Sequence, residues 1–349
     1  MENLNLYQGG RMPAYPTISF TQDHRQIIPA EQLRPVKVEE PVLVRNLPFI
    51  EANTKEASLG HLREDCIIPV FSKDNEVTIS HQSFIETVFD AAVKVFPNET
   101  ISEPAIRVSH IVKGRIPEAI HKPVSQLLES DKTIYYERMM FCIEIPTLWE
   151  DICGNRLYLT LGGVRAYNQE NLYSRKTTEK FKVFIGFKNM VCCNLCIATD
   201  GYSSCVRAME MSGLLQSCID LFRCYDMERH LSMMRDFRQY GMSEAQFAQF
   251  LGKMRLYQYL PTKARKDLPA MQMTDTQIGL VAKNYYDDED FGRGVDTCIS
   301  MWKVYNLLTG ANKSSYIDCF LERAQNASVI TEGMCRALKG DAEYSWFIS

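Results

Sequence analysis

Residues 157–202 read LYLTLGGVRAYNQENLYSRKTTEKFKVFIGFKNMVCCNLCIATDGY, and the spacing of their apolar side chains predicts the fold. Apolar residues occupy every second position in residues 157–161 and again in residues 181–187. A third apolar run, residues 191–197, follows after a short turn. Alternation with a period of two is typical of strands that place one face against a core. Successive runs of this kind predict an antiparallel sheet with one solvated face.

The same pattern extends upstream of this stretch. Residues 106–112 and 134–145 are strand-like, and we expect Pro146 to end the second run because proline cannot donate a ladder hydrogen bond. Before these strands, Ser83 and Glu86 have the spacing of a capping box and precede apolar residues at helical spacing. We therefore expect an amphipathic helix to begin near Ser83.

Downstream of the strands the apolar periodicity becomes helical. Ser243 is expected to cap one helix, and Thr274 with Gln277 forms a second capping box. The helical segments are 206–223, 226–239, 243–260, 274–286, 296–308, 316–324 and 331–338. Together these patterns predict an α+β protein, with an antiparallel β-sheet core, flanking helices and a mostly helical C-terminal region.

The 349 residues are divided by composition into three parts. Residues 1–60 contain recurring prolines and no clean periodicity, so we expect a partly ordered N-terminal arm. Residues 61–205 form the predicted β-rich core domain. Residues 206–349 form the predicted helical region, which we expect to pack on that core.

Composition narrows the class of protein. The formal net charge is −4, so overall charge does not recruit nucleic acid, and such binding would need a local basic patch. Twelve cysteines accompany an N-terminus that lacks the features of a secretory signal, which favours a cytoplasmic protein with reduced thiols. No apolar run is long enough to span a bilayer, so we expect no membrane partner.

The polar loop within residues 157–202 has the composition of a ligand-binding surface. Cations that contact phosphates and rings that stack on bases are what single-stranded nucleic acid requires. The candidate residues are Arg165, Tyr167, Asn168, Gln169, Asn171, Tyr173, Arg175, Lys176, Lys180 and Lys182. The alternative is that the lysines line solvated strand faces and the tyrosines are half-buried.

A second basic strip lies in the helical half. It contains Lys253, Arg255, Lys263, Arg265 and Lys266, close in sequence to Tyr257 and Tyr259.

Other chemistries find less support. Cys193 and Cys196 have metal-ligand spacing, but a zinc site needs four ligands, and on a strand these two would point to opposite faces. The run from Asp287 to Asp290 reads as a solvated turn, with a magnesium site as the alternative. None of the six histidines forms a sequence signature with a cysteine, and phosphate-loop and hydrolase motifs are missing. We expect no cofactor and favour a non-enzymatic role.

Several blocks resemble a known family. They are HLREDCIIPVFSKDNEVTISHQSFIETV (61–88), IRVSHIVKGRIPEAI (106–120), KTIYYERMMFCIEIP (132–146), the 161–201 part of the opening stretch, and MWKVYNLLTGANKSSYIDCFLERAQNA (301–327). From about residue 45 onward the chain resembles an uncharacterised domain-of-unknown-function family (family 3871) of Bacteroides-group bacteria, often carried on integrated mobile elements. The resemblance to plasmid- and phage-like proteins is fainter. The resemblance to the Bacteroides-group family implies a mobile-DNA setting and supplies no catalytic residues.

These observations lead to three functional hypotheses. The first is an accessory protein of mobile-element replication or recombination that binds single-stranded nucleic acid without sequence preference. In it, Tyr167 and Tyr173 would stack on bases while the loop cations contact phosphates. The second is a protein-interaction module that modulates a host or defence factor. The third is a metal-dependent enzyme that acts on nucleic acid through the acidic run 287–290.

Overall fold

The structure is a computed structural model that describes residues 47–66, 78–119, 121–170, 178–294 and 298–349. Most of the expected N-terminal arm, residues 1–46, therefore lies outside the described residues. None of the helices within the described ranges has the length and apolar character needed to cross a membrane.

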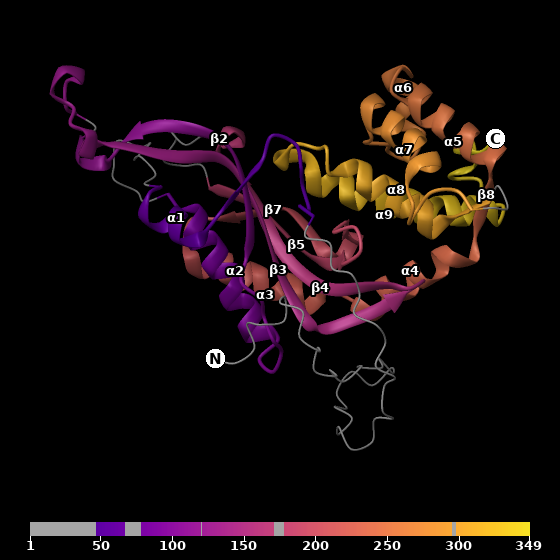
Figure 1. The fold of residues 1–349 in the computed structure, drawn as a ribbon, viewed down its shortest axis with the longest axis horizontal. Coiled ribbons are helices and arrows are strands. Elements are labelled where there is room, and N and C mark those ends of the chain that lie inside the picture. Colours follow the sequence, from indigo (N-terminus) through magenta and orange to yellow (C-terminus); the bar gives the residue numbers. More distant parts are fainter. Residues whose placement is uncertain (1–46, 67–77, 120, 171–177, 295–297) are drawn as a thin grey trace.

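A curled antiparallel sheet forms one half of the molecule (Figure 1). Its order is β1-β2-β3-β4-β5, and β6 and β7 both pair with the remaining edge of β5. The strands are β1 (Lys55–Ala57), β2 (Ala105–Arg115), β3 (Lys132–Ile152), β4 (Asn155–Ala166), β5 (Glu179–Asn189), β6 (Leu195–Cys196) and β7 (Tyr202–Ala208). The alternating runs of the opening stretch thus form β4 and β5, which are paired in register from Leu157 opposite Asn189 to Val164 opposite Lys182.

One face of the sheet is covered by α1 (Leu59–Glu64), α2 (His81–Val95) and α3 (Met211–Cys224). The ring of Phe84 on α2 lies 5.3 Å from that of Phe141 and 4.8 Å from that of Phe181. Helix α2 begins earlier than predicted, because the hydroxyl of Ser80 accepts from the backbone N–H of Ser83 and so caps the helix. Burial of its apolar stripe against the strands holds this helix in place.

The opposite face is covered as well, so the expected solvated face is wrong. Met140 and Phe184 point to this side and pack against Phe320 and Leu321, near the start of α9 (Ile317–Leu338). The prediction failed because the residues between the buried apolar positions of β3–β5 are themselves largely apolar, a pattern typical of sheets buried on both faces.

Strand β3 also differs from its prediction, because it continues through Pro146. The register between β3 and β4 shifts between Ile145 and Trp149, which places the proline in a bulge. A bulge interrupts the ladder, so the missing N–H of proline leaves no unsatisfied partner there.

The C-terminal half is helical, which confirms the α+β class. It contains α4 (Met227–Asp236), α5 (Glu244–Tyr257), α6 (Thr262–Lys266), α7 (Asp275–Asp287), α8 (Met301–Asn312) and α9, with a small hairpin of β8 (Gly241–Ser243) and β9 (Cys298–Ser300). Ser243 caps α5 as predicted, and the capping box of Thr274 with Gln277 begins α7. In Figure 1 these helices lie to the right of the sheet.

The first prediction concerns Gly162, one of two adjacent glycines in β4. A Cβ atom on Gly162 would lie 2.1 Å from the backbone oxygen of Phe141, so Gly162→Ala must push β3 and β4 apart. We expect this change to lower the free energy of unfolding by about 1–3 kcal/mol or more, measured by urea denaturation. Gly252→Ala on α5 is the control: its Cβ meets nothing within 4 Å, and alanine should stabilise that helix by about 0.5–1 kcal/mol. Equal effects would contradict the close approach of the strands.

Candidate nucleic-acid interface

Arg165, at the end of β4, lies inside the protein. Its side chain is fully buried, forms ion pairs with Glu179 and with Glu170 at 3.2 Å, and donates to the carbonyl of Ile79. Its guanidinium carbon lies 4.3 Å from the centroid of the Phe181 ring. The predicted phosphate contact by Arg165 is therefore wrong, because every polar direction of this guanidinium faces the interior of the protein.

Tyr167 is buried beside Arg165 and cannot stack on a base. Its ring lies 4.5 Å from the ring of His81, centroid to centroid, in a stacked arrangement. Burial, together with the charge of Arg165, lowers the pKa of His81 to about 3, so the stacked imidazole is neutral. Tyr167 therefore belongs to the core beneath the N-terminus of α2, which corrects its predicted role.

The remaining loop candidates are divided between paired and exposed positions. Lys182 forms an ion pair with Glu322 at 2.6 Å and donates to the carbonyl of Asp318, so α9 already occupies it. Lys180 is exposed and lies directly opposite Arg207, which is also exposed. Like charges at such a cross-strand position repel each other, which makes this edge attractive to an anion.

Six further candidates complete the comparison with the sequence. Asn168 and Gln169 are exposed in a short turn after β4. The other four, Asn171, Tyr173, Arg175 and Lys176, lie outside the described residues.

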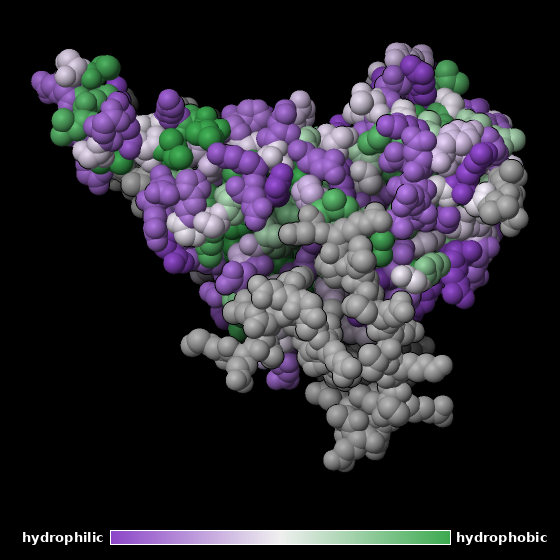
Figure 2. All heavy atoms as spheres, in the orientation of Figure 1, coloured by the Kyte–Doolittle hydropathy of each residue, from purple (hydrophilic) through white to green (hydrophobic). Residues whose placement is uncertain are grey.

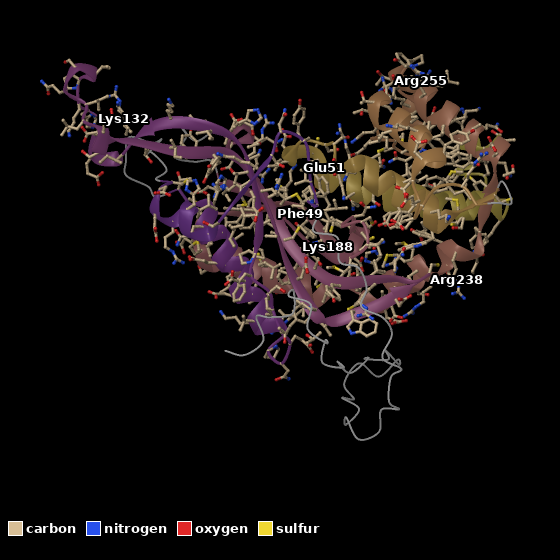
Figure 3. The ribbon with its side chains drawn as sticks, in the orientation of Figure 1. Phe49, Glu51, Lys132, Lys188, Arg238 and Arg255 are labelled. Atoms are coloured by element: carbon tan, nitrogen blue, oxygen red, sulfur yellow. The ribbon has the colours of Figure 1, made fainter. Side chains whose placement is uncertain are left out.

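The second basic strip lies on an exposed corner formed by the end of α5 and by α6, at the upper right of Figure 1. We call this corner the α5–α6 surface. It comprises Arg255, Leu256, Tyr259, Lys263, Arg265 and Lys266. Pro261 follows the last turn of α5 and directly precedes α6, so the chain changes direction here. Figure 2 shows mainly hydrophilic residues over this corner, and Figure 3 labels Arg255 on it.

Tyr259 is the ring that this surface presents to solvent. It is 73% exposed, and its neighbour Leu256 is 59% exposed, whereas Tyr257 is buried against the ring of Phe347. Five cations and no acid occur between residues 253 and 266. Within the described part of the chain, Lys263 and Lys266 have no acidic partner, while Arg255 is paired with Asp275 at 2.8 Å. An exposed ring next to unpaired lysines is the combination that base stacking and phosphate contact require.

A protein-family model described as "Domain of unknown function, B. Theta Gene description (DUF3871)" matches residues 34–348. The chain belongs to this family. No curated protein and no solved structure matches it. Because the function of this family is unknown, membership assigns no chemistry to the chain.

The fold brings together one group of side chains that the sequence did not reveal. The Cys66 sulfur lies 3.7 Å from Nε2 of His61, and Nδ1 of His61 lies 2.7 Å from Asp65. This order resembles a nucleophile, a base and an orienting acid. However, burial and the negative charge of Asp65 raise the pKa of the Cys66 thiol to about 11, so it stays protonated at neutral pH. The hydroxyl of Tyr136 also lies 3.0 Å from the same Nε2 atom.

The two candidate metal ligands are both buried in the sheet region. Cys193 lies in a turn with a φ of 58°, and Cys196 lies on β6. Burial raises the pKa of the Cys196 thiol, which disfavours the thiolate that a metal needs. Within the described residues, no group of three or more histidine, cysteine or acidic side chains is placed to hold a metal ion.

A signal in the sequence could have identified Arg165 as buried. Continuing the alternation of β4 beyond Leu161 places Gly163 and then Arg165 on the same face as the buried leucines. The same count on β5 places Glu179 on the face of Phe181. An arginine and a glutamate on one core face of adjacent strands predict an internal ion pair.

The second prediction tests this internal role. Arg165→Ala would leave the buried carboxylate of Glu170 and the half-buried carboxylate of Glu179 without their partner, so we expect the free energy of unfolding to fall by about 3–5 kcal/mol. Arg63→Ala removes an exposed pair with Glu86 and should cost about 1 kcal/mol or less. Chemical denaturation of both variants measures the difference. An Arg165→Ala protein as stable as the control would restore Arg165 as a candidate for ligand contact.

Proposed function

We propose that this protein binds single-stranded nucleic acid without sequence preference through the α5–α6 surface. The single observation that carries the proposal is the exposed ring of Tyr259 on the same corner as Lys263 and Lys266, which have no acidic partner among the described residues. Aromatic rings stack on any base, and lysines contact phosphates, so the interface needs no particular sequence. The exposed cations Lys180 and Arg207 offer a second contact for the bound nucleic acid.

The setting of this activity is part of the proposal. The resemblance of the sequence to mobile-element proteins suggests an accessory role in replication or recombination of such an element, in the cytoplasm. Overall charge argues for a local interaction, since the net charge of −4 repels nucleic acid everywhere except at basic patches. In this proposal the surface binds without catalysing a reaction: the ring of Tyr259 stacks on a base, and the lysines contact phosphates.

The third prediction tests the α5–α6 surface. Tyr259→Ala should weaken binding to a labelled oligothymidylate by about 1–3 kcal/mol, because one stacked base is lost. Lys263→Ala combined with Lys266→Ala should reduce the slope of log K against log salt by about 1.4, since each phosphate contact on a single strand contributes about 0.7. Fluorescence anisotropy at several salt concentrations measures both quantities.

Matched controls keep the surface charge and the number of exposed rings comparable. Tyr316→Ala removes another half-exposed tyrosine that lies beside a cation, Arg138. Lys94→Ala combined with Lys113→Ala removes two exposed lysines elsewhere. If the controls weaken binding as much as the α5–α6 variants, or if the wild-type protein binds no oligonucleotide at low salt, the proposed interface is wrong.

A second candidate function rests on the long hairpin of β2 and β3. Beyond Arg115 and before Lys132 the chain forms a projection, at the upper left of Figure 1, which we call the hairpin arm. Lys122 and Asp131 form an ion pair at 2.6 Å, and Asp131 accepts from the backbone of Leu128, which hold its shape. Val124 is 76% exposed and Leu128 is 62% exposed. An ordered arm that presents apolar side chains suits the binding of another protein.

The fourth prediction separates this candidate from the first. Val124→Glu combined with Leu128→Glu should abolish the retention of any specific partner from a host lysate, while oligonucleotide affinity stays unchanged. Retention through apolar contacts should also resist added salt, unlike phosphate binding. Glu118→Gln on the same arm serves as the control. A partner that the double variant still retains would exclude the hairpin arm as its docking site.

A further inference from the structure

A cavity of about 340 Å³ lies where the sheet meets the helical region. Its walls come from the short helical turn Thr199–Gly201 after β6, from α4 and from the last turns of α9. Cavities that bind small molecules start at about this size and often lie at junctions between structural units. This cavity is separate from the α5–α6 surface and from the hairpin arm, because none of their residues lines it.

His230 lines this cavity, and one of its ring nitrogens has no hydrogen-bond partner among the described residues. It is only 1% exposed, its Nδ1 atom lies 2.6 Å from the hydroxyl of Tyr225, and its Nε2 atom has no hydrogen-bond partner in the described structure. A buried polar atom without a partner costs about 1–3 kcal/mol, so such atoms call for an explanation.

The state of this imidazole follows from its surroundings. Burial lowers the pKa of His230 to about 3, so the ring is neutral, and burial raises the pKa of Tyr225 well above its usual range. A neutral imidazole carries one N–H and one acceptor nitrogen, and a phenol has one proton to donate. The Nε2 atom is sealed from solvent, so the hydrogen-bonded pair of Tyr225 and His230 forms a neutral part of the cavity wall.

The charged residues around the cavity restrict the ligand further. Three cations and three anions line it, so its formal charge is zero. Four of the six have contacts of their own: Asp200 accepts from the backbone of Asp226, Asp236 from Gln239, Arg336 pairs with Asp341, and Lys339 lies over the ring of Tyr240.

The remaining two charges face the cavity from different helices. Arg229 lies on α4 and Glu332 on α9, and neither side chain has a hydrogen-bond or ionic partner among the described residues. The buried or half-buried side chains of Met233, Phe237 and Cys335 add an apolar lining. One cation and one anion without partners among the described residues, together with an apolar lining, complement a small molecule that has one anionic group, one cationic group and an apolar part.

We propose that this cavity binds a small zwitterion of amino-acid size. Its carboxylate pairs with Arg229, its ammonium group pairs with Glu332, and its apolar side chain lies against Met233 and Phe237. A simple anion or a simple amine would leave one of the two free charges unpaired, and the neutral lining would not attract it.

The test uses the full-length protein and the twenty L-amino acids as probes. Calorimetric titration with each at millimolar concentration should identify at least one that binds. For that amino acid, the N-acetyl derivative and the decarboxylated amine should each bind about tenfold more weakly or worse, because each lacks one of the two charges. Binding of none of the twenty would overturn the proposal, since a cavity filled only by water would give that result.

Variants assign the binding to this cavity. Glu332→Gln should weaken binding of the amino acid by about tenfold, so that its affinity no longer exceeds that of the N-acetyl derivative. Arg229→Gln should likewise lower the affinity for the amino acid to that for the decarboxylated amine. Both residues are exposed, so these variants should fold. Glu118→Gln on the hairpin arm is the control. Binding that survives Glu332→Gln and Arg229→Gln unchanged would place the ligand elsewhere.

Discussion

The buried guanidinium of Arg165 is the interaction on which the sheet region depends. It lies at the end of β4 and contacts Glu179 on β5, Glu170 in the following turn and the carbonyl of Ile79 before α2. Removing a full charge from water is costly unless each donor finds a partner. The positions of these three segments therefore depend on one side chain. The ion pair with Glu170 also holds the short turn that directly follows β4.

A second polar contact network joins the helical region to the sheet. Asn306 on α8 accepts from the side chain of Asn189 at 3.1 Å, and its backbone carbonyl accepts from Asn194 at 3.0 Å. The indole N–H of Trp302 donates to Asn155 at the start of β4. These bonds hold α8 against the sheet, and α9 packs on the sheet face opposite to α2. The cavity beside His230 lies along this junction.

The location of a charged residue decides its role in this protein. Arg165 and Lys182 belong to the loop with the most suggestive composition, yet both are occupied by acidic partners inside the fold. Lys263 and Lys266 belong to a plainer stretch, but they have no acidic partner in the part of the chain that the structure describes, and they share an exposed corner with the ring of Tyr259. Because both faces of the sheet are covered, surfaces for large ligands are found at the periphery of the molecule.

The sequence by itself determined the main strands β2 to β5, most of the helices and the α+β class. Those features follow from local spacing: alternation produced β4 and β5, and the side chains of Ser243 and Thr274 cap α5 and α7. Only the tertiary structure decided that α9 covers the second face, that β3 passes through Pro146, and that Arg165 and Tyr167 are internal. These outcomes depend on contacts between residues distant in sequence, such as Arg165 with Ile79 and Lys182 with Glu322. Composition records which groups a chain carries, whereas burial and pairing, which decide what remains free to bind, arise when distant segments pack together.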